Sequence, residues 1–198
     1  LVIFAGGLIL GSRSDAVLDA LGRVASTNET VPVPLPQKLE VFGESIPVND
    51  PDIAEALSRE LHANTYWHSN TLLMLQRRPR WEARVRGWLR DEGVPEEFIY
   101  LLAAESGFQP TAFSPSGAAG FWQFMPSTAR EHGLRVDAQI DERYHAEKAT
   151  RTAARYLKNA HAKTGSWFLA AAAYNMGLTG VLRQMERQGE RNYFRMTW

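Results

Sequence analysis

Hydrophobic side chains recur at helical spacing along most of the chain after residue 52. The apolar residues of 53–61 repeat every fourth position, which places them on one face of an α-helix. Residues 146–164 continue the pattern, and shorter helices are predicted over 126–133 and around 181–185. No alternating pattern typical of a β-strand appears in this part of the chain. The pattern therefore predicts an all-α, mainly helical domain.

Proline, serine and glycine mark the ends of several predicted helices. Pro95 is followed by two acids, which suits the first turn of a helix that continues to Gly107. A helix through TLLMLQRR is predicted to end before Pro79, because proline lacks the N–H donor that a helix interior needs. Ser166 is a predicted N-cap, and Gly177 is predicted to end the helix that follows it.

The first 51 residues differ in composition from the remainder. Residues 26–51 contain five of the ten prolines, which predicts an extended Pro-rich linker or wrapping arm. The opening segment, LVIFAGGLIL, is apolar but too short to span a bilayer. It is interpreted as the end of a signal peptide or membrane anchor, with a buried strand or helix as the alternative. We therefore divide the chain into an N-terminal arm, 1–51, and a helical domain, 52–198.

Composition and charge exclude several functional classes. Lys+Arg and Asp+Glu number 22 each, so the formal net charge is zero, which argues against a nucleic-acid partner. The chain has no cysteine, which excludes disulfides, thiolate metal sites and cysteine nucleophiles. The five histidines show no ligand spacing, and no nucleotide-binding motif is present. We expect neither a metal nor a cofactor.

Glu105 stands at the end of the apolar stretch YLLAAES, directly before a predicted helix end. The C-terminal end of a helix carries partial negative charge, which disfavours a carboxylate by up to about 1 kcal/mol. Burial among leucine and alanine neighbours also disfavours the charged form, so both effects raise the pKa of Glu105. A glutamic acid that keeps its proton near neutral pH is suited to general-acid catalysis. The alternative is a solvated surface residue.

The loop at 108–125 brings polar and small residues next to Glu105. Ser114, Ser116 and two nearby glycines would let the main chain approach a ligand closely. Gln123 offers a donor and an acceptor beside Trp122. Each feature also has an ordinary structural explanation, because glycines form turns, serines form caps and aromatic side chains fill cores.

Three segments taken in order resemble the motifs of a known family. Glu105-Ser106, GAAGFWQF at 117–124 and AYN at 173–175 are similar to the motifs of the soluble-lytic-transglycosylase fold, glycoside hydrolase family 23. The resemblance covers about residues 70–198 and implies a lysozyme-like helical domain. Family members continue beyond the segment NYFRMTW, so we expect a domain that is shorter at its C-terminus.

The resemblance assigns roles to individual residues. Glu105 matches the single catalytic acid, and Tyr174 matches a tyrosine whose hydroxyl reaches that carboxyl. Trp122 is expected either to form the floor of a sugar cleft or to pack in the core. The expected substrate-binding residues are Ser114, Ser116, Gln123, Trp122, Tyr174 and Asn175.

The implied reaction cleaves the bond between N-acetylmuramic acid and N-acetylglucosamine in peptidoglycan without water. Most glycosidases use two carboxyl groups, but substrate-assisted enzymes are an exception. Here Glu105 would act first as acid and then as base, while the 6-hydroxyl closes a 1,6-anhydro ring. Two alternatives remain open: a goose-type lysozyme-like hydrolase and a non-catalytic wall-binding module.

The resemblance also implies a setting for the protein. We expect a monomer on the periplasmic side of a bacterial envelope, with peptidoglycan glycan strands as its partner and membrane association through the N-terminal segment. Arg77, Arg78 and Arg80 form a small basic cluster. It is interpreted as a solvated helix end, with contact to an anionic wall polymer as the alternative.

Overall fold

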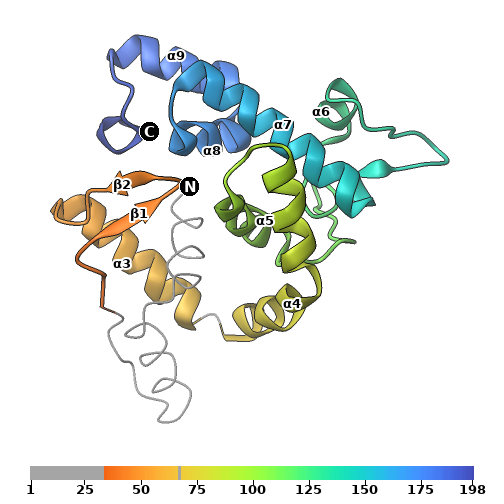
Figure 1. The fold of residues 1–198 in the computed structure, drawn as a ribbon, viewed down its shortest axis with the longest axis horizontal. Helices are drawn as coiled ribbons and strands as arrows, with labels where there is room; N and C mark the ends of the chain where they lie inside the picture. Colours follow the sequence, from red (N-terminus) through yellow and green to blue (C-terminus); the bar gives the residue numbers. More distant parts are fainter. Residues whose placement is uncertain (1–33, 67) are drawn as a thin grey trace.

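The computed structural model describes residues 34–66 and 68–198, and most of these residues are helical (Figure 1). The α-helices are α3 (Pro51–Tyr66), α4 (His68–Asp91), α5 (Ile99–Ser106), α6 (Pro126–Glu131), α7 (Ala146–Thr164), α8 (Trp167–Met176) and α9 (Leu178–Gln188). The short elements are the strands β1 (Leu39–Val41) and β2 (Glu44–Ile46) and the 3₁₀ helices η1 (Glu96–Phe98), η2 (Glu142–Tyr144) and η3 (Tyr193–Arg195). The predicted all-α fold class is confirmed. The apolar segment 1–10 lies outside the described residues.

The centre of the core is the contact between α7 and α8. Ala149, Ala153 and Ala160 are fully buried on one face of α7. This helix packs against α8, in which the four consecutive alanines 170–173 are buried. Small side chains on both helices allow the two backbones to approach closely. The ends of α8 agree with the sequence analysis, because the Ser166 hydroxyl accepts a hydrogen bond from the Leu169 N–H and the helix ends before Gly177.

The prediction that a helix ends before Pro79 is wrong, because α4 runs through this residue without a break. A proline at this position leaves the carbonyl of Leu75 without its helical partner. Leu75 lies on an exposed part of α4, where water can pair with that carbonyl. Buried contacts of Val85 and Leu89 farther along α4 hold the helix against the core.

The Pro-rich segment contains a β-hairpin that the sequence analysis did not predict. Strands β1 and β2 pair antiparallel through a turn at Phe42 and Gly43, and both turn residues have positive φ. Such turns match the twist of a hairpin, but positive φ is unfavourable for phenylalanine. Phe42 is buried, and its ring stacks on Phe98 at 4.4 Å and meets Phe168 edge-on at 5.4 Å. Tertiary packing therefore selects this turn.

Glu44 fastens the hairpin to the start of α8. Its carboxylate accepts hydrogen bonds from the Ser166 hydroxyl at 2.7 Å and from the Trp167 N–H at 2.5 Å. The first N–H groups of a helix have no partner within the helix, and the helix dipole favours an anion there. The hairpin thus shares the core and a helix cap with the helical domain. The division of the chain at residue 51 stays a prediction.

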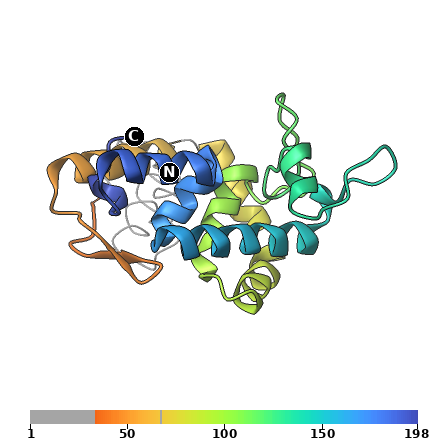
Figure 2. The same ribbon diagram turned by 90° about the horizontal axis from the view of Figure 1, so that it is seen from above.

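Figures 1 and 2 show the hairpin at one end of the molecule and α6 at the other, with α5 between them. The long helix α7 runs beneath α5 in the view of Figure 2. Within residues 34–66 and 68–198, no helix has both the length and the apolar character needed to cross a bilayer. The loop that connects α5 to α6 begins at Gly107, directly after the last turn of α5.

Replacing Glu44 with alanine tests the link between the hairpin and α8. We expect Glu44→Ala to lower the free energy of unfolding by about 1–2 kcal/mol, because two donors at the helix start lose their acceptor. Urea denaturation followed by circular dichroism measures this change. Glu40→Ala is the matched control, since Glu40 is exposed on the neighbouring strand. Equal unfolding midpoints for the two variants would contradict the capping role.

Candidate active site

Glu105 lies in the last turn of α5, a helix that is buried over its first five residues. The helix ends at Gly107, whose φ of 56° places it in the left-handed region and whose N–H donates to the Ala103 carbonyl. The Ser106 hydroxyl donates to the Leu102 carbonyl, so the final turn is well paired. The Glu105 side chain is half-buried, and burial raises the pKa of its carboxyl. This is the direction that the sequence analysis predicted.

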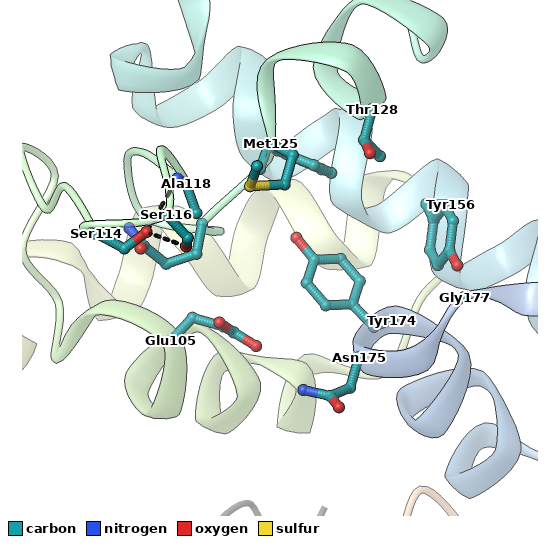
Figure 3. Close-up of a pocket in the computed structure, with 12 residues that line it drawn as sticks. Glu105, Ser114, Ser116, Ala118, Met125, Thr128, Tyr156, Tyr174, Asn175 and Gly177 are labelled. Atoms are coloured by element: carbon teal, nitrogen blue, oxygen red, sulfur yellow. Dashed lines mark hydrogen bonds between the residues drawn. The ribbon is translucent and has the colours of Figure 1, made fainter.

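Two cavities meet at Glu105. The larger has a volume of about 550 Å³ and extends from Glu105 toward α6 and α8 (Figure 3). The smaller has a volume of about 380 Å³ and extends toward the first half of α4. Glu105, Ser114 and Gln123 line both cavities. A ligand longer than one ring could therefore pass the carboxyl and contact the protein on both sides.

The two predicted serines belong to a tight turn on the wall of the larger cavity. The hydroxyls of Ser114 and Ser116 are 2.8 Å apart, and the Ala118 N–H donates to the Ser114 hydroxyl at 3.0 Å. The Ser114 N–H donates to the Ala118 carbonyl, which closes the turn. These bonds orient Ser114 and Ser116 toward the cavity that contains Glu105 (Figure 3).

Gln123 occupies an unusual backbone conformation, with a φ of 48°. Its side-chain amide donates to the Gly120 carbonyl at 2.8 Å, which fixes the amide group within the loop. Gly120 also has positive φ, and a Cβ atom there would lie 1.9 Å from the Arg143 carbonyl oxygen. Glycine is therefore required at position 120 on two grounds.

Tyr174 and Asn175, at the end of α8, line the larger cavity opposite the loop (Figure 3). The Tyr174 hydroxyl donates to the Trp122 carbonyl at 2.7 Å. No hydrogen bond joins this hydroxyl to the Glu105 carboxyl among the described residues, so the contact that the resemblance implies stays a prediction. Burial, and secondarily the nearby Glu105 charge, hold the pKa of Tyr174 well above its usual value. The hydroxyl therefore remains a neutral hydrogen-bonding group.

Trp122 takes the packing role that the sequence analysis left open. Its side chain is 0% exposed, and its indole N–H donates to the Thr150 hydroxyl at 2.9 Å. It lines neither cavity among the described residues, so the expectation that it forms the cleft floor is corrected. Its ring packs edge-on against the ring of Tyr174.

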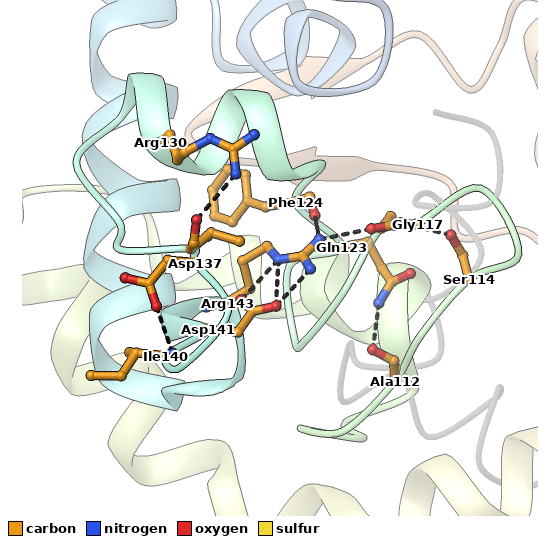
Figure 4. Close-up of polar contacts among 12 residues, drawn as sticks. Ala112, Ser114, Gly117, Gln123, Phe124, Arg130, Asp137, Ile140, Asp141 and Arg143 are labelled. Atoms are coloured by element: carbon orange, nitrogen blue, oxygen red, sulfur yellow. Dashed lines mark hydrogen bonds and ion pairs between the residues drawn. The ribbon is translucent and has the colours of Figure 1, made fainter.

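Arg143 stabilises the loop at 108–125, and the sequence analysis did not predict this role. Its side chain is 5% exposed, and one guanidinium nitrogen donates to the carbonyls of Gly117 and Phe124 (Figure 4). The other side of the guanidinium binds the Asp141 carboxylate, which lowers the pKa of that carboxyl. A buried charge needs such a complete set of partners. The segment DERYH carries no pattern that distinguishes this arginine from a surface one.

Sequence analysis also missed the far wall of the larger cavity, which Met125, Thr128 and Tyr156 form. The Tyr156 hydroxyl donates to the Ala173 carbonyl at 2.6 Å and so ties α7 to the helix that carries Tyr174. Across the part of the chain that the structure describes, Glu105 is the only acid lining either cavity. No cluster of three potential metal ligands occurs in that part of the chain.

Comparison with known proteins finds similarity over the segment that holds this site. The family model described as "Transglycosylase SLT domain" matches residues 85–196. The chain is 32% identical over 142 residues to membrane-bound lytic murein transglycosylase D of Escherichia coli strain K12, covering 71% of this chain and 30% of that protein. It is 44% identical over 88 residues to peptidoglycan transglycosylase gp16 of Escherichia phage T7, covering 43% of this chain and 7% of that protein. The chain thus spans less than a third of the length of either relative.

Replacing Arg143 with lysine tests the brace. We expect Arg143→Lys to lower the free energy of unfolding by about 1–3 kcal/mol, because lysine cannot reproduce the fork that binds Asp141 and two carbonyls together. Hydrogen exchange should accelerate at the amides of Ala119 and Gly120, within the loop, more than at Ala170 in α8. Arg135→Lys is the control, because Arg135 forms an exposed ion pair with Asp137. Uniform acceleration across the protein would argue against a local brace.

Proposed function

The chain belongs to the transglycosylase SLT domain family, whose model matches more than half of its residues, and on this premise we propose that it is a peptidoglycan lytic transglycosylase. In this proposal it cleaves the β-1,4 bond between N-acetylmuramic acid and N-acetylglucosamine and leaves 1,6-anhydro ends. The names of its relatives support this choice of substrate and reaction.

One observation carries the proposal: a single half-buried carboxyl, Glu105, stands where two cavities meet, and no other acid among the described residues lines them. An inverting hydrolase needs a second carboxylate to activate water, and a retaining one needs a second carboxylate as nucleophile. A substrate that supplies its own nucleophile needs neither. The geometry therefore favours the transglycosylase over a lysozyme-like hydrolase.

The proposed reaction uses Glu105 twice. The protonated carboxyl donates its proton to the glycosidic oxygen as the bond from that oxygen to C1 of N-acetylmuramic acid breaks. The resulting carboxylate accepts the proton of the 6-hydroxyl on the same sugar, and the 6-oxygen bonds to C1. Every proton is accounted for, and no water is consumed. Burial suits both steps, because it keeps the acid protonated before cleavage and makes the carboxylate a stronger base afterwards.

The neighbouring polar residues would position the sugar for ring closure. We assign this role to Ser114, Ser116, Gln123 and Asn175, which line the larger cavity around Glu105. Tyr174 would contribute its hydroxyl, whose oxygen can still accept a hydrogen bond from a ligand while its hydrogen is donated to the Trp122 carbonyl. Closure of the anhydro ring depends on alignment of the 6-oxygen with C1, so rigid side chains are favourable.

The proposed substrate also implies a location. A peptidoglycan-cleaving domain acts where glycan strands are present, so we propose that the protein works in a bacterial envelope, on the periplasmic side. The relative from Escherichia coli is named as a membrane-bound enzyme, which is in keeping with this location.

Glu105→Gln tests the proposed acid. We expect its turnover of purified peptidoglycan to fall by about 10²–10⁴-fold or more, the contribution typical of general acid–base catalysis. Binding of glycan strands should persist, because glutamine keeps the shape of the side chain. Mass spectrometry of the wild-type products should show 1,6-anhydro ends, which are lighter than reducing ends by one water molecule.

Each other outcome identifies a different error in the proposal. Reducing ends from the wild-type protein would indicate lysozyme-like hydrolysis. Strand binding without any cleavage would indicate a wall-binding module. Turnover that survives in Glu105→Gln would show that another group is the acid. Ser116→Ala serves as a milder comparison within the same cavity.

The raised pKa of Glu105 predicts how activity depends on pH. Only the protonated acid can start the reaction, so kcat/KM should fall about tenfold per pH unit above the native pKa of Glu105. Because burial raises that pKa, the decline should begin above the usual range of glutamic acid, about 4.3. A pH series of initial rates on soluble glycan strands measures it. A decline centred at the usual value would contradict the effect of burial.

The pH dependence of the free energy of unfolding provides a second, independent test of the raised pKa of Glu105. Native Glu105 keeps its proton at pH values where the unfolded chain has already lost it. The free energy of unfolding should therefore decrease as pH rises from about 4.3 to the native pKa. Glu105→Gln should lack this component of the decrease and be the more stable protein at neutral pH.

A further inference from the structure

The smaller cavity has a cationic wall that the proposed reaction does not use. It lies between the first half of α4 and the loop after α5, and its lining includes Asn70, Met74, Arg77, Gln109 and Phe113 in addition to Glu105. Among the described residues that line it, Arg77 is the only cation. Arg77 also precedes residues 85–196, which the family model matches.

Among the described residues, Arg77 lacks the carboxylate partner that three other arginines of α4 have, although Arg80 and Arg84 lack one as well. Arg78 and Arg86 bind the Glu82 carboxylate, and Arg90 binds Glu96. Within the part of the chain that the structure describes, Arg77 forms no ion pair. Its one hydrogen bond is a long donation of 3.4 Å to the Gly107 carbonyl, directly after α5.

This bond places the guanidinium near the end of α5 without neutralising its charge. A guanidinium has five N–H donors, and a single carbonyl occupies only one of them. Arg77 is half-buried, so its remaining donors face a confined space in which a charge-assisted hydrogen bond is stronger than in bulk water. The side chain is therefore arranged to bind an anion from outside the described protein.

The rest of the cavity suits a ligand that combines sugar and peptide character. The Phe113 ring is 65% exposed and offers a flat apolar surface, while Asn70 and Gln109 supply amide groups. An apolar surface with a few convergent polar groups is typical of a ligand site. Glu105 is the only acid among the described residues that line the cavity, so a negatively charged group would meet little repulsion there.

We propose that Arg77 binds a carboxylate on the 3-substituent of N-acetylmuramic acid and thereby positions the strand relative to Glu105. This inference rests on the proposed function and extends it to the choice of substrate. In N-acetylmuramic acid the substituent is a lactyl ether, which ends in a free carboxylate in bare strands. In strands that carry peptide stems the lactyl group is an amide, and the carboxylates lie on the stem.

The experiment compares wild type, Arg77→Gln and Arg80→Gln on matched soluble strands. Stem-bearing strands are used directly, and bare strands are made from them by removing the stems with an amidase. A portion of each is treated with carbodiimide and methylamine, which converts its carboxylates to neutral methylamides. Arg80 is the control because it is an exposed arginine on the same helix, one turn away, and lines neither cavity.

We expect Arg77→Gln to lower kcat/KM by about tenfold to hundredfold on strands with free carboxylates, the range for loss of a charge-assisted hydrogen bond. The same variant should equal wild type on the methylamide strands, which also shows that it is folded. A loss on stem-bearing strands alone identifies the stem carboxylate, and a loss on bare strands identifies the lactyl carboxylate. Arg80→Gln should resemble wild type on every strand.

The inference is overturned if Arg77→Gln loses equal activity on acid and methylamide strands, or loses none, or if Arg80→Gln loses as much. A wild-type protein that cleaves no strand would contradict the proposed function instead. In that case the role of Arg77 is tested by binding affinity instead of turnover. Stem-bearing and bare strands are titrated into the Glu105→Gln variant and into the double variant Glu105→Gln/Arg77→Gln. A weaker affinity of the double variant that disappears on methylamide strands supports the carboxylate site without any chemistry.

Discussion

The proposed function depends on one carboxyl group that is half-buried at the end of an apolar helix. Glu105 gains no stability there, because both the helix dipole and the loss of water disfavour its charged form. The surrounding fold must offset this cost. It does so with the buried first turns of α5, which contribute the hydrophobic contacts that hold the helix end in place. The unfavourable position is what provides an acid that retains its proton.

The loop after α5 needs its own support because it combines positive-φ residues with a tight turn. Gly120 closes against the main chain of Arg143, and the Arg143 side chain binds the loop at Gly117 and Phe124. The opposite wall is held in a comparable way, since Tyr174 bonds to the Trp122 carbonyl and Glu44 caps the helix that carries Tyr174. Contacts distant in sequence therefore fix the distance between the two walls of the cavity.

Local signals predicted the parts of this fold that local chemistry determines. The caps and ends of α5 and α8 followed from Gly107, Ser166 and Gly177, and the raised pKa of Glu105 followed from its apolar neighbours. Features selected by tertiary packing were not predictable in this way. Phe42 accepts positive φ only because its ring enters the core, and Arg143 becomes a brace only when the loop folds over it. In both cases the deciding partners are far away along the chain.

The two charged groups at the junction have opposite requirements, and the geometry separates them. A cation close to Glu105 would lower the pKa of its carboxyl and deprive the reaction of its proton. Among the described residues no cationic side chain lowers that pKa, although Arg77 lines the same smaller cavity. The Arg77 guanidinium donates instead to the Gly107 carbonyl, directly after α5. The proposed anion site therefore does not require the pKa of Glu105 to be lowered. In the proposed function, one cavity thus serves both the binding of an anionic group and proton transfer.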